Sequence, residues 1–333
     1  MATSSSSAAP AAARDRAHRA PALVVHGGAW DIPDAETDAH LDGLRTAVAR
    51  GQRVLDRGGS ALDAAEAAVV AMEAHPAFDA GRGSVLDRDG AAQLDAGIMC
   101  GATLQWGAIA GVRVLDHPIR AARALLDDAG GVAFGARLLV GEGAERFAAE
   151  IGLPHVAPER LVVDRERDRF FAIRADPTYH PSRGIAGPDA GPDAPRGTVG
   201  AVALDAAGRL AAATSTGGMP YARAGRVGDA PLVGSGFYAD GHAALSATGW
   251  GEAIATVQLC ARVALRVEAG EVPEAAARAA LAAMRAAVRW PGAAPATGGV
   301  IVLAADGTPG WAFTTPRMAR GGWSAGGEAW EAV

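Results

Sequence analysis

The chain has 333 residues, of which 50% are hydrophobic and 20% charged, as expected for a soluble globular protein with a substantial core. Its formal net charge of −6 argues against nucleic-acid binding, which usually needs a basic surface. All 31 basic residues are arginines, so a Schiff-base lysine and the lysine of a phosphate-binding P-loop are excluded.

The N-terminus and the metal-binding residue types narrow the class further. Residues 1–20 lack the apolar core of a signal peptide, which predicts a disordered tail and a cytoplasmic protein, with a targeting or nucleic-acid arm as the alternative. No uncharged apolar stretch approaches ~18 residues, so no membrane span is expected. Cys100 and Cys260 form no CxxC pair and the eight histidines form no HExxH pattern, so neither a disulfide framework nor a transition-metal site is predicted.

Helices are predicted where apolar residues recur at helical spacing. The helix over residues 61–74 has the clearest start, because Ser60 and Asp63 form a capping-box pattern. In chain order, the expected helices cover residues 41–57, 61–74, 118–128 and 141–150, followed by two Ala-rich helices that begin near Gly251 and Pro273.

Strands are predicted where short apolar segments lie between turn residues, such as Asp89 and Gly90. The polar, Pro- and Gly-rich residues 155–197 are predicted to be a flexible linker within one domain over residues 21–333. Helices grouped between strands indicate stacked layers, with helices on both faces of antiparallel sheets. The expected strands cover residues 22–26, 84–90, 91–100, 103–112, 199–204, 209–216, 231–239 and 242–248, and a last hairpin lies within 298–315.

Thr198 is the most informative single residue, because it opens a predicted strand directly after the linker. If the Gly197–Thr198 bond were cut, this threonine would carry a hydroxyl nucleophile and a free α-amine on one residue. Such an amine has a pKa near 7.7–8.0 and can act as a general base at neutral pH. Taken alone, these residues favour an ordinary threonine at the start of a strand over a nucleophile.

An ordered set of segments resembles the plant-type L-asparaginase and isoaspartyl peptidase family of N-terminal nucleophile hydrolases. The resemblance implies an α+β fold, namely a four-layer αββα sandwich. It also implies a precursor that cuts itself at Gly197–Thr198 into an α chain ending at residue 197 and a β chain of residues 198–333, assembled as (αβ)₂. The matching segments are VVHGGAW, GGSALDAAEAAVVAME, HPAFDAGRGSVLDRDGAAQLDAGIM, GAIAGV, HPIRAARAL, GEGAERFA, GTVGAVALD, AAATSTGGM, GRVGDAPLVGSGFYA, ATGWGEA and GGVIVL.

The same resemblance assigns roles to residues around the nucleophile. Thr216 would hydrogen-bond the hydroxyl of Thr198, and Thr248 with Gly249 would stabilise the oxyanion of the tetrahedral intermediate. The substrate's α-carboxylate would bind Arg226, and its α-ammonium would bind Asp229 and the carbonyl of Gly251.

The family also has a loop that wraps a sodium ion with main-chain carbonyls, and no organic cofactor is expected. In this chain the corresponding carbonyls belong to Met72, Glu73, His75, Phe78, Ala80 and Arg82. Other positions depart from the family, which usually has Asn at Asp79, commonly Asp at Cys100, a smaller residue at Trp250 and often Gly at Trp30. These departures leave activity level and substrate size open.

The predicted function is hydrolysis of L-asparagine to L-aspartate and ammonia, together with cleavage of β-aspartyl dipeptides. A glycosylasparaginase that acts on N4-(β-N-acetylglucosaminyl)-L-asparagine is an alternative, although a cytoplasmic location argues against it. A non-catalytic scaffold homologue is the other alternative. The candidate catalytic and binding residues are all present, which argues against the scaffold.

Overall fold

Two β-sheets of unequal size form the centre of the computed structural model, which describes residues 19–128, 130–179, 197–289 and 295–333. The larger sheet has eight strands in the order β12-β11-β1-β5-β6-β2-β3-β4, antiparallel except for the β3–β4 pair. Its strands are β1 (Ala22–Trp30), β2 (Leu94–Cys100), β3 (Trp106–Val112), β4 (Leu138–Val140), β5 (Val199–Leu204), β6 (Leu210–Thr216), β11 (Arg317–Ser324) and β12 (Trp330–Ala332). The smaller, antiparallel sheet has the order β10-β9-β8-β7, formed by β7 (Phe237–Ala239), β8 (Ala243–Gly249), β9 (Gly298–Ala304) and β10 (Pro309–Phe313).

The sheets pack face to face because their central strands are apolar on both faces. On β5, Val202 and Leu204 join the cluster between the sheets, together with Phe237 and Ile301 of the smaller sheet. The alternate residue Ala201 belongs to the cluster under the helices. This division follows from the alternation of side chains along a strand.

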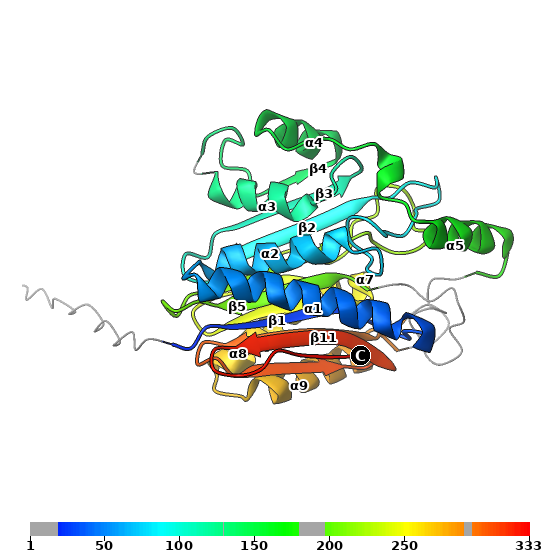
Figure 1. The fold of residues 1–333 in the computed structure, drawn as a ribbon. Coiled ribbons are helices and arrows are strands. Elements are labelled where there is room, and N and C mark those ends of the chain that lie inside the picture. Colours follow the sequence, from blue (N-terminus) through cyan, green and yellow to red (C-terminus); the bar gives the residue numbers. More distant parts are fainter. Residues whose placement is uncertain (1–18, 129, 180–196, 290–294) are drawn as a thin grey trace, which may run out of the picture.

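Helices cover the outer face of each sheet (Figure 1). Helices α1 (Asp34–Asp56), α2 (Ala61–Ala74) and α3 (Pro118–Asp127) contact the larger sheet, whereas α8 (Leu259–Glu268) and α9 (Pro273–Ala287) contact the smaller one. This arrangement confirms the predicted αββα sandwich. The remaining helices are α4 (Gly141–Glu150), α5 (Asp164–Ala175), α7 (Gly251–Val257) and the 3-10 turn η1 (Pro158–Arg160).

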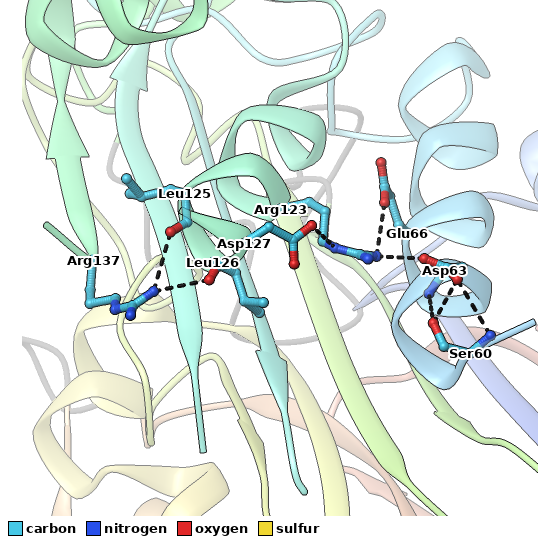
Figure 2. A network of polar contacts seen from close by, with 8 residues as sticks. All are labelled: Ser60, Asp63, Glu66, Arg123, Leu125, Leu126, Asp127 and Arg137. Carbon is cyan, nitrogen blue, oxygen red and sulfur yellow. Dashed lines mark hydrogen bonds and ion pairs between the residues drawn. The ribbon is translucent and has the colours of Figure 1, made fainter. Parts of the chain in front are cut away.

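The start of α2 is fixed by the predicted capping box. Asp63 N donates to Ser60 Oγ at 3.1 Å, and the Asp63 carboxylate in return accepts from Ser60 N. Arg123 of α3 donates to Asp63, Glu66 and Asp127, so it links the two helices (Figure 2). Arg137 caps the end of α3 by donating to two of its last carbonyls.

Strand β1 joins the two halves of the sequence. On one side it pairs with β5, where Ala22 lies opposite Leu204, and on the other with β11, where Ala22 lies opposite Ser324. A segment from the first part of the chain is thus hydrogen-bonded between two strands of the last part.

Several predicted elements need correction. Residues 84–90 form no strand, because Asp87 uses both backbone and side chain to close a turn around Gly90. The predicted linker contains η1 and α5, whose Phe170 and Ile173 are buried, and only its residues 180–196 lie outside the described part, as do residues 1–18 of the predicted tail. The hairpin within 298–315 is followed by β11 and β12, and the helix from Gly251 breaks at Gln258, which has a positive φ of 52°.

Candidate active site

Thr198 lies next to Thr216 because β5 and β6 are antiparallel neighbours with Val199 opposite Ser215. The Oγ1 atoms of the two threonines are 3.1 Å apart, and Thr198 is buried with 7% of its surface exposed. Thr216 Oγ1 also accepts a hydrogen bond from Gly218 N at 3.0 Å. The predicted pairing of these hydroxyls is therefore present in the structure, and Thr216 is held by a second contact.

The Gly197–Thr198 peptide bond packs tightly against β1. A β-carbon on Gly197 would lie 2.3 Å from Gly28 Cα, too close for any side chain. Gly28 lies in the irregular part of β1 between His26 and Ala29 and has a φ of +105°, which favours glycine. Glycine at both positions allows the two backbones to touch.

A buried polar cluster between the sheets adjoins Thr198, and sequence reasoning missed it. His26 Nε2 lies 2.8 Å from Ser246 Oγ, which lies 2.6 Å from Thr214 Oγ1. Burial lowers the pKa of His26 to about 3, despite the opposing effect of the Thr198 backbone. His26 is therefore neutral, and these residues form a network without net charge beneath the strand end.

The predicted oxyanion residues lie at the end of β8. Thr248 is fully buried, and its hydroxyl has no hydrogen-bond partner within the described residues. Gly249 has a φ of +131° and approaches Gly298 so closely that a β-carbon would lie 2.4 Å from Gly298 Cα. An unsatisfied buried hydroxyl is costly and is compatible with a donor reserved for a transient ligand atom.

The residues of the predicted substrate clamp lie together, but the Arg226 guanidinium has an internal partner. Arg226 Nε and Nη2 each donate to one carboxylate oxygen of Glu252 at 2.9 Å. Burial alone would lower the pKa of Arg226, but the contact with Glu252 and the charges of Asp229 and Asp95 together outweigh burial and raise it. The sequence analysis missed Glu252, although it directly follows the ATGWG segment.

Asp229 and Gly251 are the other residues of the predicted substrate clamp. Burial raises the pKa of Asp229 to about 7, and its Oδ2 has no hydrogen-bond partner within the described residues. A β-carbon on Gly251 would lie 2.8 Å from Arg226 Nη2 and 2.9 Å from Asp229 Oδ1. Glycine at 251 therefore leaves the space between the two charged groups open.

These residues surround a single hollow. Of the predicted catalytic and binding residues, Thr198, Thr216, Arg226, Asp229, Gly249 and Gly251 all line it. Gly197 and Thr248 are their direct chain neighbours. Gly218, Met219, Gly228 and Trp250 complete the lining.

The positions that depart from the family have different surroundings. Asp79 is fully buried, and its backbone carbonyl accepts from Gly217 N at 2.9 Å, beside Thr216. Trp250 lines the hollow and also packs into the core under α8 and α9, and a hydrogen bond from its side chain helps to lower the pKa of Glu252. Cys100 ends β2 and is partly exposed.

In the predicted sodium-binding loop, two glycines lie against backbone carbonyl oxygens. A β-carbon on Gly81 would lie 2.5 Å from Glu73 O, and one on Gly83 would lie 2.7 Å from Phe78 O. Both glycines have positive φ, a backbone conformation that favours glycine. Hard cations prefer such oxygen ligands. Within the described residues, no group of three or more His, Cys, Asp or Glu side chains could hold a metal ion.

Comparisons with known proteins agree with this geometry. A family model described as asparaginase matches residues 19–330. A Danio rerio protein named isoaspartyl peptidase/L-asparaginase is 41% identical over 299 residues, which cover 90% of each chain. A Homo sapiens protein of the same name is 38% identical, covering 86% of this chain and 88% of its own. A Salmonella typhimurium isoaspartyl peptidase is 42% identical, covering 69% of this chain and 73% of its own.

Proposed function

Because the chain belongs to the asparaginase family matched over residues 19–330, we propose that it is a self-processing amidohydrolase with an N-terminal threonine nucleophile. It hydrolyses L-asparagine to L-aspartate and ammonia and cleaves β-aspartyl dipeptides, the activities in the names of its relatives. One observation carries this proposal: a threonine pair and an Arg–Asp clamp line the same hollow.

Self-cleavage comes first. The hydroxyl of Thr198 attacks the carbonyl carbon of Gly197, the peptide C–N bond breaks, and the freed amine takes up the proton. Water then hydrolyses the resulting ester, which leaves a carboxylate on Gly197 and a free α-amine on Thr198. The close packing of Gly197 on Gly28 supports this step, because it holds the scissile bond in one position.

The mature nucleophile then acts on a side-chain amide. The α-amine of Thr198 removes the hydroxyl proton, and Oγ1 attacks the amide carbon, while Thr216 keeps that oxygen in place. The oxyanion accepts hydrogen bonds from the unpartnered hydroxyl of Thr248 and from the backbone at Gly249. Ammonia or an amino acid leaves, and water hydrolyses the acyl-enzyme.

Recognition uses both charges of the amino-acid substrate. The α-carboxylate binds Arg226 and displaces the Glu252 carboxylate, which occupies the same two donors. The α-ammonium binds Asp229 in its ionised form, together with the carbonyl of Gly251. Ionising the buried Asp229 carboxyl without a nearby cation costs free energy, as its raised pKa indicates. The ammonium group of the substrate supplies that cation.

A sodium ion held by the carbonyls of residues 72–82 would stabilise the loop that supports Asp79 and Gly217. The (αβ)₂ assembly and a cytoplasmic location stay predictions from the sequence. Within the described residues, no helix has the length and apolar content that crossing a membrane requires.

The proposal is tested with purified precursor. Incubation followed by a denaturing gel and mass spectrometry should give fragments 1–197 and 198–333, and a Thr198→Ala variant should stay whole. The cleaved protein should release ammonia from L-asparagine and free amino acid from β-Asp-Leu. Cleavage of the Ala variant at this bond, or a processed wild type without either activity, contradicts the proposal.

A further inference from the structure

Asp95 lies where the nucleophile strands meet the substrate clamp. It is 2% exposed, and in the β2–β6 register it lies opposite Thr216. Its Oδ1 accepts from Gly111 N at 2.8 Å and its Oδ2 accepts from Gly228 N at 3.4 Å. The carboxylate therefore connects strand β3 to the loop that carries the clamp.

The hydrogen bond between Gly228 N and Asp95 connects Asp95 to the substrate-binding residues Arg226 and Asp229. It lies between Arg226 and Asp229 in the sequence, and a β-carbon built on it would lie 2.9 Å from Arg226 Nη1. The loop backbone and the guanidinium are thus in contact, so a shift of Gly228 moves both groups that bind the substrate.

The carboxylates around Arg226 differ in how firmly they are held. The Glu252 side chain is 45% exposed, and it occupies the donors that a substrate carboxylate needs. Asp95 is buried and held by two backbone N–H groups. Its negative charge raises the pKa of Arg226, and it stays in place when Glu252 leaves.

We propose that Asp95 is a positioning residue for substrate recognition. It holds the loop over residues 226–229 in its binding geometry, and it balances the charge of Arg226 while a substrate carboxylate replaces Glu252. This inference rests on the proposed function, because it concerns the affinity of the same hollow for an amino-acid substrate.

Asp95→Asn tests the assignment, because it keeps the shape of the side chain but removes the charge and turns a donor toward Gly228 N. Loss of a charged hydrogen bond predicts a KM for β-Asp-Leu raised by about tenfold or more. Self-cleavage should proceed at the wild-type rate, since it involves no substrate carboxylate, and kcat should change by less than about threefold. Asp205→Asn is the matched control. Asp205 is also 2% exposed and accepts backbone hydrogen bonds, but it follows β5 at the end remote from Thr198.

A pH profile separates positioning from a general loss of stability. The charged groups that act on Asp229 are Arg226, which lowers its pKa, and Glu252 and Asp95, which raise it. Burial raises the pKa of Asp95 itself to about 6, so its charge is present at the pH near 7 where Asp229 titrates. Removing that charge should therefore move the acidic limb of kcat/KM to lower pH. Asp205→Asn should leave that limb where it is in the wild type.

The outcomes are distinct. An Asp95→Asn variant with wild-type KM and an unmoved acidic limb overturns the assignment, as does one whose kcat and self-cleavage fall together with KM unchanged. If the Asp95→Asn variant does not fold, Asp95→Ser is measured in the same way, because serine has no amide group that could turn a donor toward Gly228 N. A wild-type protein inactive on both substrates contradicts the proposed function itself, whereas an active wild type with an unaffected variant contradicts only the role of Asp95.

Discussion

The two walls of the hollow are built differently. On the nucleophile wall, strand register places Thr198 beside Thr216, and the polar contacts join neutral hydroxyls. On the clamp wall, Arg226, Asp229 and Glu252 bring charges into a largely buried loop and helix start. Under the proposed function, catalysis depends on the alignment of the backbone strands and substrate recognition depends on the balance of charges, so mutations should separate the two.

The largest effect is expected on the nucleophile wall. Thr216→Val keeps the shape but removes the hydroxyl 3.1 Å from Thr198 Oγ1, so self-cleavage and hydrolysis should both slow, by roughly 10²-fold, the scale of losing one positioned hydrogen-bonding group. Gel densitometry and an ammonia assay measure the two rates. Thr256→Val, on the exposed side of α7, is the control. A Thr216→Val variant that loses only self-cleavage or only hydrolysis would show that Thr198 and Thr216 do not act as a unit in both reactions.

On the clamp wall, Arg226→Ala should impair recognition and spare self-cleavage. A charged, two-point contact contributes ~1.5–3 kcal/mol, so kcat/KM for L-asparagine should fall at least about tenfold. Arg223→Ala, an exposed arginine of the same loop, controls for loss of charge in general. Wild-type kinetics in the Arg226 variant would remove this residue from the clamp.

The same wall should give activity and stability opposite responses to pH. Burial raises the pKa of Asp229 to about 7, so the ionised form that binds an ammonium is lost, and kcat/KM falls, as the pH drops through about 7. The folded state binds this proton more tightly than the unfolded state, so the contribution of Asp229 to stability is full below the ordinary carboxyl pKa. It is lost as the pH rises toward about 7.

The stability difference between wild type and Asp229→Asn, from thermal unfolding at pH 5 and pH 8, checks the second half of this prediction. The wild type should lose stability relative to the variant at the higher pH. A difference that does not depend on pH would show that Asp229 titrates normally.

The smallest effect is expected at Trp250, which belongs to both the hollow and the core. If its ring narrows the exit, Trp250→Thr should raise activity on β-Asp-Leu relative to L-asparagine, because only the dipeptide must place a whole residue there. If the ring instead stacks on the leaving residue, the ratio should drop. An unchanged ratio would show that Trp250 acts only as a core residue.

The sequence predicted the parts of this fold that depend on local signals. The capping box at Ser60 and the neighbouring strands over residues 199–204 and 209–216 are encoded locally, and both are present. The antiparallel pairing of these strands places Thr198 beside Thr216. The fold of residues 317–332 was missed, because β11 pairs with β1, almost 300 positions earlier in the chain. Helix α5 was missed because its charged sequence has little apolar periodicity, and tertiary packing decides its structure.

Local sequence signals also predicted only some of the residues of the site. The resemblance named Thr198, Arg226 and Asp229, and the structure brings them to one hollow, but their catalytic roles stay predictions until they are measured. Asp95 and Glu252 went unnoticed because a single carboxylate in a strand or helix start gives no signal by itself. Their importance comes from contacts with Gly228 and Arg226 that only the folded chain makes.

The position of β1 also has a consequence for the lifetime of the mature protein. After cleavage, β1 belongs to the first fragment, while its neighbours β5 and β11 both belong to the second. The precursor refolds as one molecule, at a rate independent of protein concentration, but the separated fragments must first collide. Maturation therefore turns a reversible folding reaction into a concentration-dependent assembly. The lifetime of the mature pair is then set by its unfolding rate, because dilute fragments find each other too slowly to rebuild it.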